Sequence, residues 1–412
     1  MDGSGAQAGS VETRTSWVVA IAALTVLSVS YGAPLTTVVA LKPIAEEFGA
    51  TRSAPALAVA LTFIGAGCGG IAMGWIAERI GVRAVVIFGG AMIGTGLTIS
   101  SLGGLTQLYI SSFLLVGLLG AAGMFAPLMT YVSRWFDVRR GTAIALISAG
   151  QYIAGALWPP LFQYGIGAIG WRGTMLAYAV FAVVVIVPLA AIFLRRAPKA
   201  AALGGIYDGP RVGEKVLGLP PNLVLAALGF ATFCCCMTMS MPMAHMVAFC
   251  SDIGIAPAQG AAMLSVLLGS AFFARQFWGW LADRIGGLRT ILWASAAQAT
   301  AMAGFLVTQD EIGLFTISAV FGFGFGGLIP GYVLAARELF PASEASWRIP
   351  TMLLPGSLGM AGGGWLAGVM YDRFAFYAPA FAVGVLFNLL NLAVIGALVM
   401  RSRQWRPSTA LA

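Results

Sequence analysis

Apolar segments long enough to cross a lipid bilayer recur along the whole chain and constrain its fold more than any other feature. A bilayer core takes a helix of about 20 predominantly apolar residues. Only 9% of the 412 residues are charged, against about 25% in soluble domains. We therefore predict an all-α membrane protein with twelve transmembrane helices, at residues 17–41, 54–77, 82–103, 105–133, 142–167, 172–194, 222–250, 257–282, 288–308, 311–336, 346–370 and 375–400.

Basic residues in the loops predict which side of the membrane each loop faces. When the loops are assigned alternately to the two sides, one side carries 18 of the 23 Lys and Arg residues. The other side carries Lys42, Arg52, Arg172 and Arg373, and Arg275 is left inside a span. Since cytoplasmic loops are enriched in Lys and Arg, we expect both termini in the cytoplasm and the chain in the cell (inner) membrane. The net charge of +8 is spread out rather than gathered in a patch, so no nucleic-acid partner is expected.

A long polar segment with Pro and Gly lies at the midpoint of the sequence and divides it into two halves. We predict an N-terminal bundle of six helices at 17–194, a cytoplasmic linker at 195–221 and a C-terminal bundle of six helices at 222–400. The tails are then 1–16 and 401–412. Because the first 16 residues lead into a full span, we expect no cleavable signal.

The two halves share a motif at the end of their second span. The first half has GWIAERIG at 74–81 and the second has GWLADRIG at 279–286, an offset of 205 residues. The exits of the fourth and tenth spans, at Arg134 and Arg337, match at nearly the same offset. A duplication of this kind predicts two pseudo-symmetric bundles that can rock against each other about a site between them.

The first copy of this motif extends to G-x-x-x-[DE]-R-x-G-x-R, with Gly74, Glu78, Arg79, Gly81 and Arg83, and resembles the signature of the major facilitator superfamily. A carboxylate at a helix end can pair with Arg and with a neighbouring helix N-terminus. We interpret the motif as a latch that holds the cytoplasmic side closed. The remaining latch residues are Gly279, Asp283, Arg284, Arg134 and Arg337. The alternative is that these charges only solvate loops and fix the topology.

Further motifs are similar to the branch of this superfamily that contains monocarboxylate transporters and oxalate/formate antiporters. They are RWFDVRRG at 134–141, SAGQY at 148–152 with Pro159-Pro160, PMAH at 242–245 with DIG at 252–254, and RQFWG at 275–279. In that branch an arginine of span eight binds the substrate carboxylate, and the matching residue is Arg275. Oxalate exchangers add a lysine in span eleven, whereas LPGSLG at 354–359 has none. The resemblance therefore favours a monocarboxylate over a dicarboxylate.

Arg275 is a candidate site without the resemblance as well. A charged side chain inside a span costs about 2.5–3.5 kcal/mol on insertion scales and by default marks a pathway or a site. Residue 271, one turn earlier, is Ala rather than an acid. Eight residues separate Arg275 from Asp283, about 12 Å along a helix, so snorkelling to the cytoplasmic surface is the weaker alternative. An unpaired guanidinium at this depth suits a carboxylate.

Position along the spans nominates further residues, although each of them also fits a packing role. The candidates near the depth of Arg275 are Tyr31, Phe125, Gln151, Phe325 and Ser357. Two aromatic residues closer to the cytoplasm, Tyr131 and Tyr332, are candidate gates. His245 is the single His, near the outer end of span seven, and its titration range suits proton coupling or an outer vestibule. A hydrogen-bonded structural histidine is the alternative.

Other features argue against enzymes and against ATP-driven pumps. The G-x-G-x-x-G patterns at 65–70 and 322–327 lie inside spans without a βαβ unit, and no G-x-x-x-x-G-K-[ST] motif occurs. The five cysteines lie in apolar spans without metal-ligand spacing, so we expect neither a metal nor another cofactor.

Together these features predict a monomeric secondary transporter that works by alternating access. We expect its substrate to be a small, lactate- or pyruvate-like monocarboxylate, carried together with a proton. A carboxylate antiporter of the oxalate/formate type remains an alternative. A transporter-like ligand sensor is a second one.

Overall fold

The computed structural model describes residues 12–136, 139–195, 215–341 and 344–404 of the chain. These residues form helices and no β-sheet, apart from one isolated bridge between Val216 and Leu219. The predicted all-α fold is therefore confirmed. Residues 1–11, 137–138 and 405–412, and the linker between 196 and 214, lie outside the described residues.

The N-terminal half contains the six predicted spans, two of which are interrupted. Its elements are α1 (Arg14–Val39), α2 (Leu41–Glu47), α3 (Ser53–Ile80), α4 (Val82–Leu102), α5 (Leu105–Ile110), the π-helix η1 (Ser111–Gly120), the 3₁₀-helix η2 (Ala121–Gly123), α6 (Phe125–Ser133), α7 (Arg140–Ser148) and α8 (Gly150–Phe193). The short helix α2 lies beyond the end of span one. Span four runs from α5 to α6, and span five contains a break between α7 and α8.

The C-terminal half follows with six spans in seven helices. Its elements are α9 (Pro221–Asp252), α10 (Pro257–Ile285), α11 (Gly287–Val307), α12 (Glu311–Gly326), α13 (Leu328–Leu339), α14 (Ala345–Phe374) and α15 (Ala378–Gln404). Proline at the first position of α9 and α10 suits a helix start, where its missing N–H is not needed. The Asp310 carboxylate caps α12 by accepting a hydrogen bond from the Gly313 N–H.

Ten helical segments of the described chain are long and apolar enough to cross a membrane. One of them, Thr142–Phe193, holds two spans, because Gly170 breaks the helix of α8 with φ 72°. The predicted eleventh span corresponds to α14, which is long enough but falls outside that set. With these two adjustments, the helices agree with the twelve predicted spans.

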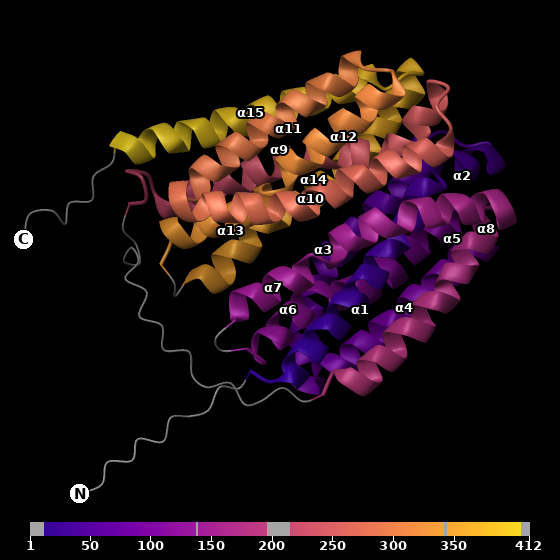
Figure 1. The fold of residues 1–412 in the computed structure, drawn as a ribbon, viewed down its shortest axis with the longest axis horizontal. Coiled ribbons are helices and arrows are strands. Elements are labelled where there is room, and N and C mark those ends of the chain that lie inside the picture. Colours follow the sequence, from indigo (N-terminus) through magenta and orange to yellow (C-terminus); the bar gives the residue numbers. More distant parts are fainter. Residues whose placement is uncertain (1–11, 137–138, 196–214, 342–343, 405–412) are drawn as a thin grey trace, which may run out of the picture.

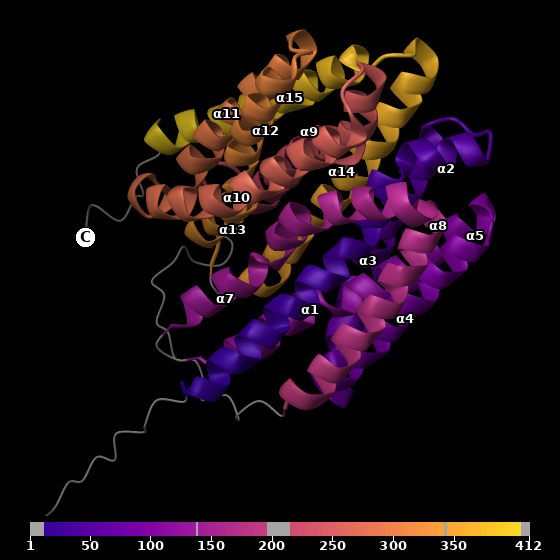
Figure 2. The same cartoon turned by 45° about the vertical axis from the view of Figure 1, so that its right-hand side comes forward.

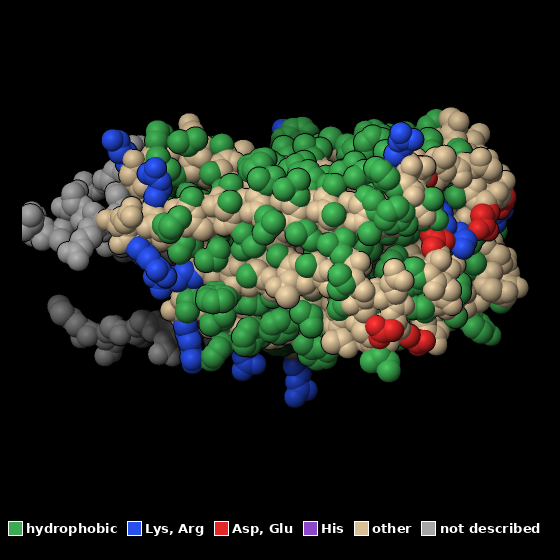
Figure 3. All heavy atoms as spheres, turned by 90° about the horizontal axis from the view of Figure 1, so that it is seen from above, with side chains coloured by type: hydrophobic (Ala, Val, Ile, Leu, Met, Phe, Trp, Pro, Cys, Tyr) green, Lys and Arg blue, Asp and Glu red, His purple; other side chains and the backbone are tan. Residues whose placement is uncertain are grey.

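Two bundles of helices lie side by side, one from each half of the sequence (Figures 1 and 2). Across the boundary, α3 packs along α14, and α8 packs along α10. We call the end that holds Arg14, Gly81 and Gly286 the terminal end, because α1 begins and α15 ends there. Lys and Arg side chains gather near this end, and acidic side chains are visible near the opposite one (Figure 3).

The duplicated motif folds in the same way in both halves. In each copy a helix ends at a glycine with positive φ, and the next helix begins immediately after it. Gly81 has φ 94° and ψ 145°, and Gly286 has φ 82° and ψ 162°. This backbone region is essentially restricted to glycine. The repeat therefore preserves a turn that only this residue type forms without strain.

Candidate functional site

Arg275 lies on α10 at the boundary between the halves. Its Nη1 donates hydrogen bonds to the Ser148 carbonyl (3.2 Å) and the Ser148 hydroxyl (2.9 Å), at the end of α7. Its guanidinium carbon lies 4.9 Å from the centre of the Tyr152 ring on α8. Among the described residues no carboxylate lies within ion-pair distance of Arg275, and its Nε atom is buried without a hydrogen-bond partner.

Aromatic side chains from four helices form two contacting pairs, and one member of each pair lies near this guanidinium. The rings of Tyr152 and Phe325 are 6.1 Å apart, and those of Tyr31 and Phe125 meet edge to face at 6.3 Å. Tyr31 lies within electrostatic range of both Arg275 and Tyr152. Of the predicted candidates, Tyr31 thus lies near Arg275, while Phe125 and Phe325 pack behind Tyr31 and Tyr152. The negative face of such a ring attracts a guanidinium.

Two other predicted aromatic residues lie inside their own halves. The Tyr131 hydroxyl donates to the carbonyl of Arg195, in the N-terminal half. Tyr332 is fully buried, and its hydroxyl donates to Asn391 Oδ1 at 2.6 Å. That contact belongs to a buried network that also contains Ser295, Gln298 and Asn388. In this conformation both hydroxyls are occupied by structural contacts, so their gating role stays a prediction.

Ser357 and Gln151, the remaining predicted contacts, are both half-buried. Ser357 lies on α14, and its side chain is 3.3 Å from the position that a Cβ on Gly67 of α3 would occupy. It therefore lies at the boundary between the halves. Gln151 lies in the first turn of α8, next to Tyr152. The structure brings neither of them into a hydrogen bond with Arg275.

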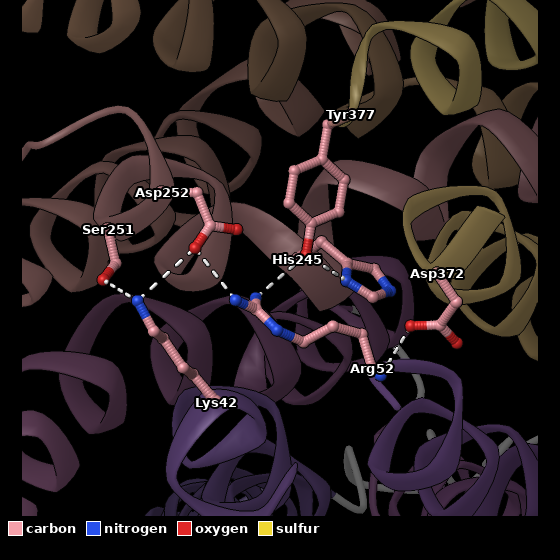
Figure 4. Close-up of polar contacts among 7 residues, drawn as sticks. All are labelled: Lys42, Arg52, His245, Ser251, Asp252, Asp372 and Tyr377. Carbon is pink, nitrogen blue, oxygen red and sulfur yellow. Dashed lines mark hydrogen bonds and ion pairs between the residues drawn. The ribbon is translucent and has the colours of Figure 1, made fainter. Parts of the chain in front are cut away.

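The opposite end carries a cluster of charges that joins the two halves, shown in Figure 4. Asp252, at the end of α9, pairs with Arg52 at 2.8 Å and with Lys42 at 3.4 Å. The Asp372 carboxylate of α14 accepts hydrogen bonds from the backbone N–H groups of Arg52 and Ser53, at the start of α3. Cations and a helix N-terminus of the first half thus face carboxylates of the second half. We call these residues the outer cluster.

Arg52 also links the outer cluster to His245. Its Nη1 donates to the Tyr377 hydroxyl (3.4 Å), which lies 3.1 Å from His245 Nδ1 (Figure 4). On the other side of the ring, His245 Nε2 lies 2.8 Å from the Gly364 carbonyl. Because the carbonyl only accepts, Nε2 carries a proton, and in the neutral form of the ring Nδ1 accepts from Tyr377. Burial acts to lower the pKa of Arg52, but Tyr377 and Asp252 outweigh it and raise that pKa. Arg52 therefore stays charged.

The charged residues of the predicted latch lie at the terminal end and are exposed. Glu78 and Asp283 form no ion pair with another described residue, and Arg83, Arg134 and Arg337 are likewise exposed. The two motif arginines stack instead on the tryptophans four residues earlier. Arg79 lies 3.5 Å from the Trp75 ring centre, and Arg284 lies 4.0 Å from that of Trp280. The two copies share this stack as well as the glycine turn.

Another arginine of the C-terminal half, Arg348, is buried and already neutralised. It pairs with Glu344 at 2.6 Å, also donates to Asn222, and lies against the rings of Phe340 and Trp347. Its charge is thus used within the C-terminal half, in contrast to that of Arg275.

Sequence reasoning did not nominate several residues that the structure brings to these sites. Ser148 and Tyr152 touch Arg275 although only their motif was noted, and a polar residue next to a helix break was the available signal. Asp252 and Asp372 belong to the outer cluster, and Tyr377 connects Arg52 of that cluster with His245. Their signal was weaker, because charges near helix ends are common in any membrane protein.

Comparison with known proteins agrees with this fold and these motifs. The family model described as Major Facilitator Superfamily matches residues 18–346. Monocarboxylate transporter 13 of Rattus norvegicus is 27% identical over 334 residues, which cover 78% of this chain and 74% of that protein. Monocarboxylate transporter 11 of Homo sapiens is 28% identical over 373 residues, covering 86% and 73%.

Solved structures show the same fold. A bacterial homologue of the human lysosomal transporter Spinster, in an inward-facing and occupied conformation, superposes with a TM-score of 0.73 at 15% identity. The match covers 96% of this chain and all of that one. The predicted fold of two six-helix bundles is therefore confirmed.

Proposed function

Because the chain belongs to the major facilitator superfamily and is a transporter rather than an enzyme, we propose that it carries small monocarboxylates, lactate- or pyruvate-like, by alternating access. The names of the similar monocarboxylate transporters 13 and 11 support this substrate class. We also propose that both termini are cytoplasmic, which makes the terminal end the cytoplasmic end and the opposite end the outer end.

The observation that carries the proposal is the state of Arg275. Its charge lies between the halves without a carboxylate partner among the described residues, and its Nε is buried and unbonded. Leaving a buried polar group unpaired costs about 1–3 kcal/mol, and more for a charged one. A carboxylate supplies both the missing charge and the missing acceptor. Since Arg348 is already paired, the single charge of Arg275 suits one carboxylate.

The surrounding side chains complete the proposed substrate site. Tyr31, Phe125 and Phe325 would contact the apolar part of the acid, and Gln151 and Ser357 would supply polar contacts. Tyr131 and Tyr332 would act nearer the cytoplasm as the bundles move. At the cytoplasmic end, Glu78, Asp283 and their neighbouring arginines would form the latch in the state that is closed there.

We propose that a proton travels with the acid. Carrying an anion into a cell against an inside-negative potential costs about 2.3 kcal/mol per charge per 100 mV, whereas an acid with its proton crosses without net charge. His245 is the candidate carrier, since it is neutral here and its Nδ1 can take a proton only if the Tyr377 hydrogen bond changes. Antiport of one carboxylate against another is the alternative coupling.

Binding to purified protein tests the substrate site. A thermal-shift panel of lactate, pyruvate, benzoate and oxalate is expected to give saturable stabilisation by monocarboxylates. Arg275→Ala should abolish the shift while the protein stays folded in the membrane, and Arg337→Ala, an exposed arginine, should keep it. Undiminished binding by the Arg275→Ala variant would remove the central claim.

Transport by proteoliposomes tests the coupling. If a proton is carried along, a proton gradient directed into the vesicles, with the outside more acidic, should drive uptake of radiolabelled pyruvate. If uptake does not change with the pH difference but requires pyruvate preloaded inside the proteoliposomes, the antiporter is favoured instead.

A further inference from the structure

The break between α7 and α8 changes which backbone carbonyl accepts from the N–H groups at the start of α8. In an unbroken helix the Ser148 carbonyl would accept from the N–H of Tyr152, four residues later. Here that N–H donates to the Ala149 carbonyl at 3.0 Å, and the N–H of Ile153 donates to the same atom. The turn is therefore tightened by one residue, and the Ser148 carbonyl is available to Arg275 at 3.2 Å.

The sequence at this break allows a second helix to come close. Gly150 starts α8, and a Cβ at this position would lie 3.0 Å from the Leu24 carbonyl and from the Leu27 Cβ of α1. The backbone of span five thus rests directly on α1. Since α7 ends at Ser148, the negative end of its helix dipole also points at the guanidinium.

These contacts occupy one corner and one face of the guanidinium. Nη1 is held by the hydroxyl and carbonyl of Ser148, and the face lies on Tyr152. Nε is buried without a partner, and Nη2 has no hydrogen bond to a described residue. Nε and Nη2 together form one of the edges with which arginine binds a carboxylate through two parallel hydrogen bonds.

We propose that Ser148 is a positioning residue for the substrate site. It holds the Nη1 corner of Arg275 so that the Nε–Nη2 edge faces the substrate carboxylate. The inference rests on the proposed function, in which Arg275 binds that carboxylate. Because Ser148 belongs to the first half and Arg275 to the second, it also means that both halves hold the side chain that binds the acid.

The test compares three serine variants with pyruvate as the probe. Ser148→Ala removes the hydroxyl and keeps the carbonyl, Ser148→Thr keeps both, and Ser270→Ala is the control. The Ser270 hydroxyl lies on α10 but bonds the Leu267 carbonyl of its own helix. Half-saturation and maximal rate of uptake are measured in proteoliposomes, and half-saturation of the thermal shift is measured on purified protein.

Ser148→Ala is expected to raise the half-saturation concentration about tenfold, the effect of one hydrogen bond to a charged group. The maximal rate should change by less than about twofold. Ser148→Thr and Ser270→Ala should behave like the natural protein. An unchanged half-saturation in Ser148→Ala overturns the proposal, and so does a loss that threonine does not restore, since that result indicates packing alone.

The Arg275→Ala variant distinguishes failure of this inference from failure of the proposed function on which it rests. If Arg275→Ala still binds pyruvate, or if the natural protein binds no acid of the panel, the proposed function fails and the role of Ser148 falls with it. If Arg275→Ala loses binding while Ser148→Ala keeps it unchanged, only the role of Ser148 fails.

Discussion

In the proposed orientation, the outer and cytoplasmic ends of the protein use charge in opposite ways. At the outer end, Asp252 and Asp372 of the second half hold Arg52, Lys42 and the start of α3. At the cytoplasmic end, Glu78 and Asp283 pair with no other described residue, and the motif arginines stack on tryptophans of their own helices. The difference indicates that the two sets of charges serve two states. Under alternating access, the outer cluster must come apart when the latch forms.

The largest expected effect comes from removing the charge at the centre of the outer cluster. Asp252→Asn keeps the shape of the side chain but weakens the contacts with Arg52 and Lys42, which lie at 2.8 Å and 3.4 Å. Hydrogen bonds to charged groups contribute about 1.5–3 kcal/mol each, so the outer-open state should gain population tenfold or more. The measurement is maleimide labelling from outside at a Ser357→Cys site in a Cys68→Ser background.

Glu46→Gln provides the control for this experiment, because Glu46 is an exposed acid of α2 that pairs with no other described residue. It should label at the rate of the unmodified background. If Asp252→Asn also labels at that rate, the outer cluster does not hold the outer end closed. The outer charges would then not differ from the cytoplasmic ones in holding the two halves together.

A smaller effect is expected from the paired glycine turns at the cytoplasmic end. Gly81→Ala and Gly286→Ala place a Cβ on backbone with φ near 90°, which costs about 1–3 kcal/mol. Each variant should lower the midpoint of thermal unfolding by several degrees in detergent. Equal losses in the two copies would show that the repeat supplies the same turn to both bundles.

Gly74→Ala and Gly279→Ala are the matched controls within the same motif. A Cβ at either position meets no other atom within 4 Å, so their unfolding midpoints should not fall. If the latch closes around these glycines in the other state, their transport rate should fall nevertheless. Normal transport by both variants would contradict a close approach there and leave the motif with its turn alone.

The sequence predicted this division only in part. Arg275 could be found because a charge stands out in an apolar span, and the latch motif because it is repeated. The outer cluster could not, since Arg52 and Asp252 are 200 residues apart and loop charges by themselves indicate only orientation. The contact of Ser148 with Arg275 depends on the Tyr152 N–H donating to the Ala149 carbonyl rather than to the Ser148 carbonyl. No residue pattern in the sequence indicates this.

The helices are apolar on all sides, so the sequence did not indicate which way the side chains of the remaining candidates point. Tyr332 was predicted as a gate on the cytoplasmic side of the substrate path because of its depth in the span. The structure directs its hydroxyl at Asn391 of α15 instead. In a helix of a soluble protein, the polar and apolar faces would have shown which side chains point to solvent and which to the core. Here residues on all sides are apolar, so depth could be estimated from the sequence but direction could not.

The stacked arginines of the cytoplasmic end should contribute less than its glycines. Arg79→Lys and Arg284→Lys keep the charge but lose the planar group that lies over Trp75 and Trp280. An exposed cation–π contact is worth about 0.5–1 kcal/mol, so the unfolding midpoint should fall by only a few degrees. Arg83→Lys is the control, since this exposed arginine stacks on no described ring. A loss as large as that of the glycine variants would mean that the stacks, too, hold the turn.

The smallest effect should come from an ion pair that lies at the outer end but within one half. Glu47 accepts from Arg172 at 2.7 Å and from Trp171. Burial acts to raise the pKa of Glu47, but these hydrogen bonds outweigh it and lower that pKa below its ordinary 4.5. The side chain is 41% exposed, so the pair should stabilise the fold by less than about 0.5 kcal/mol.

Glu47→Gln therefore separates stability from the closure of the outer end. A lowered pKa stabilises the fold at pH values above the ordinary one. The small advantage of the natural protein over Glu47→Gln should thus be complete at pH 7 and fade as the pH falls through the lowered pKa. Maleimide labelling at the Ser357→Cys site should stay unchanged, because Glu47 and Arg172 both belong to the N-terminal half. Faster labelling in Glu47→Gln would mean that any charge at the outer end holds the halves together, and that Asp252 has no special part in it.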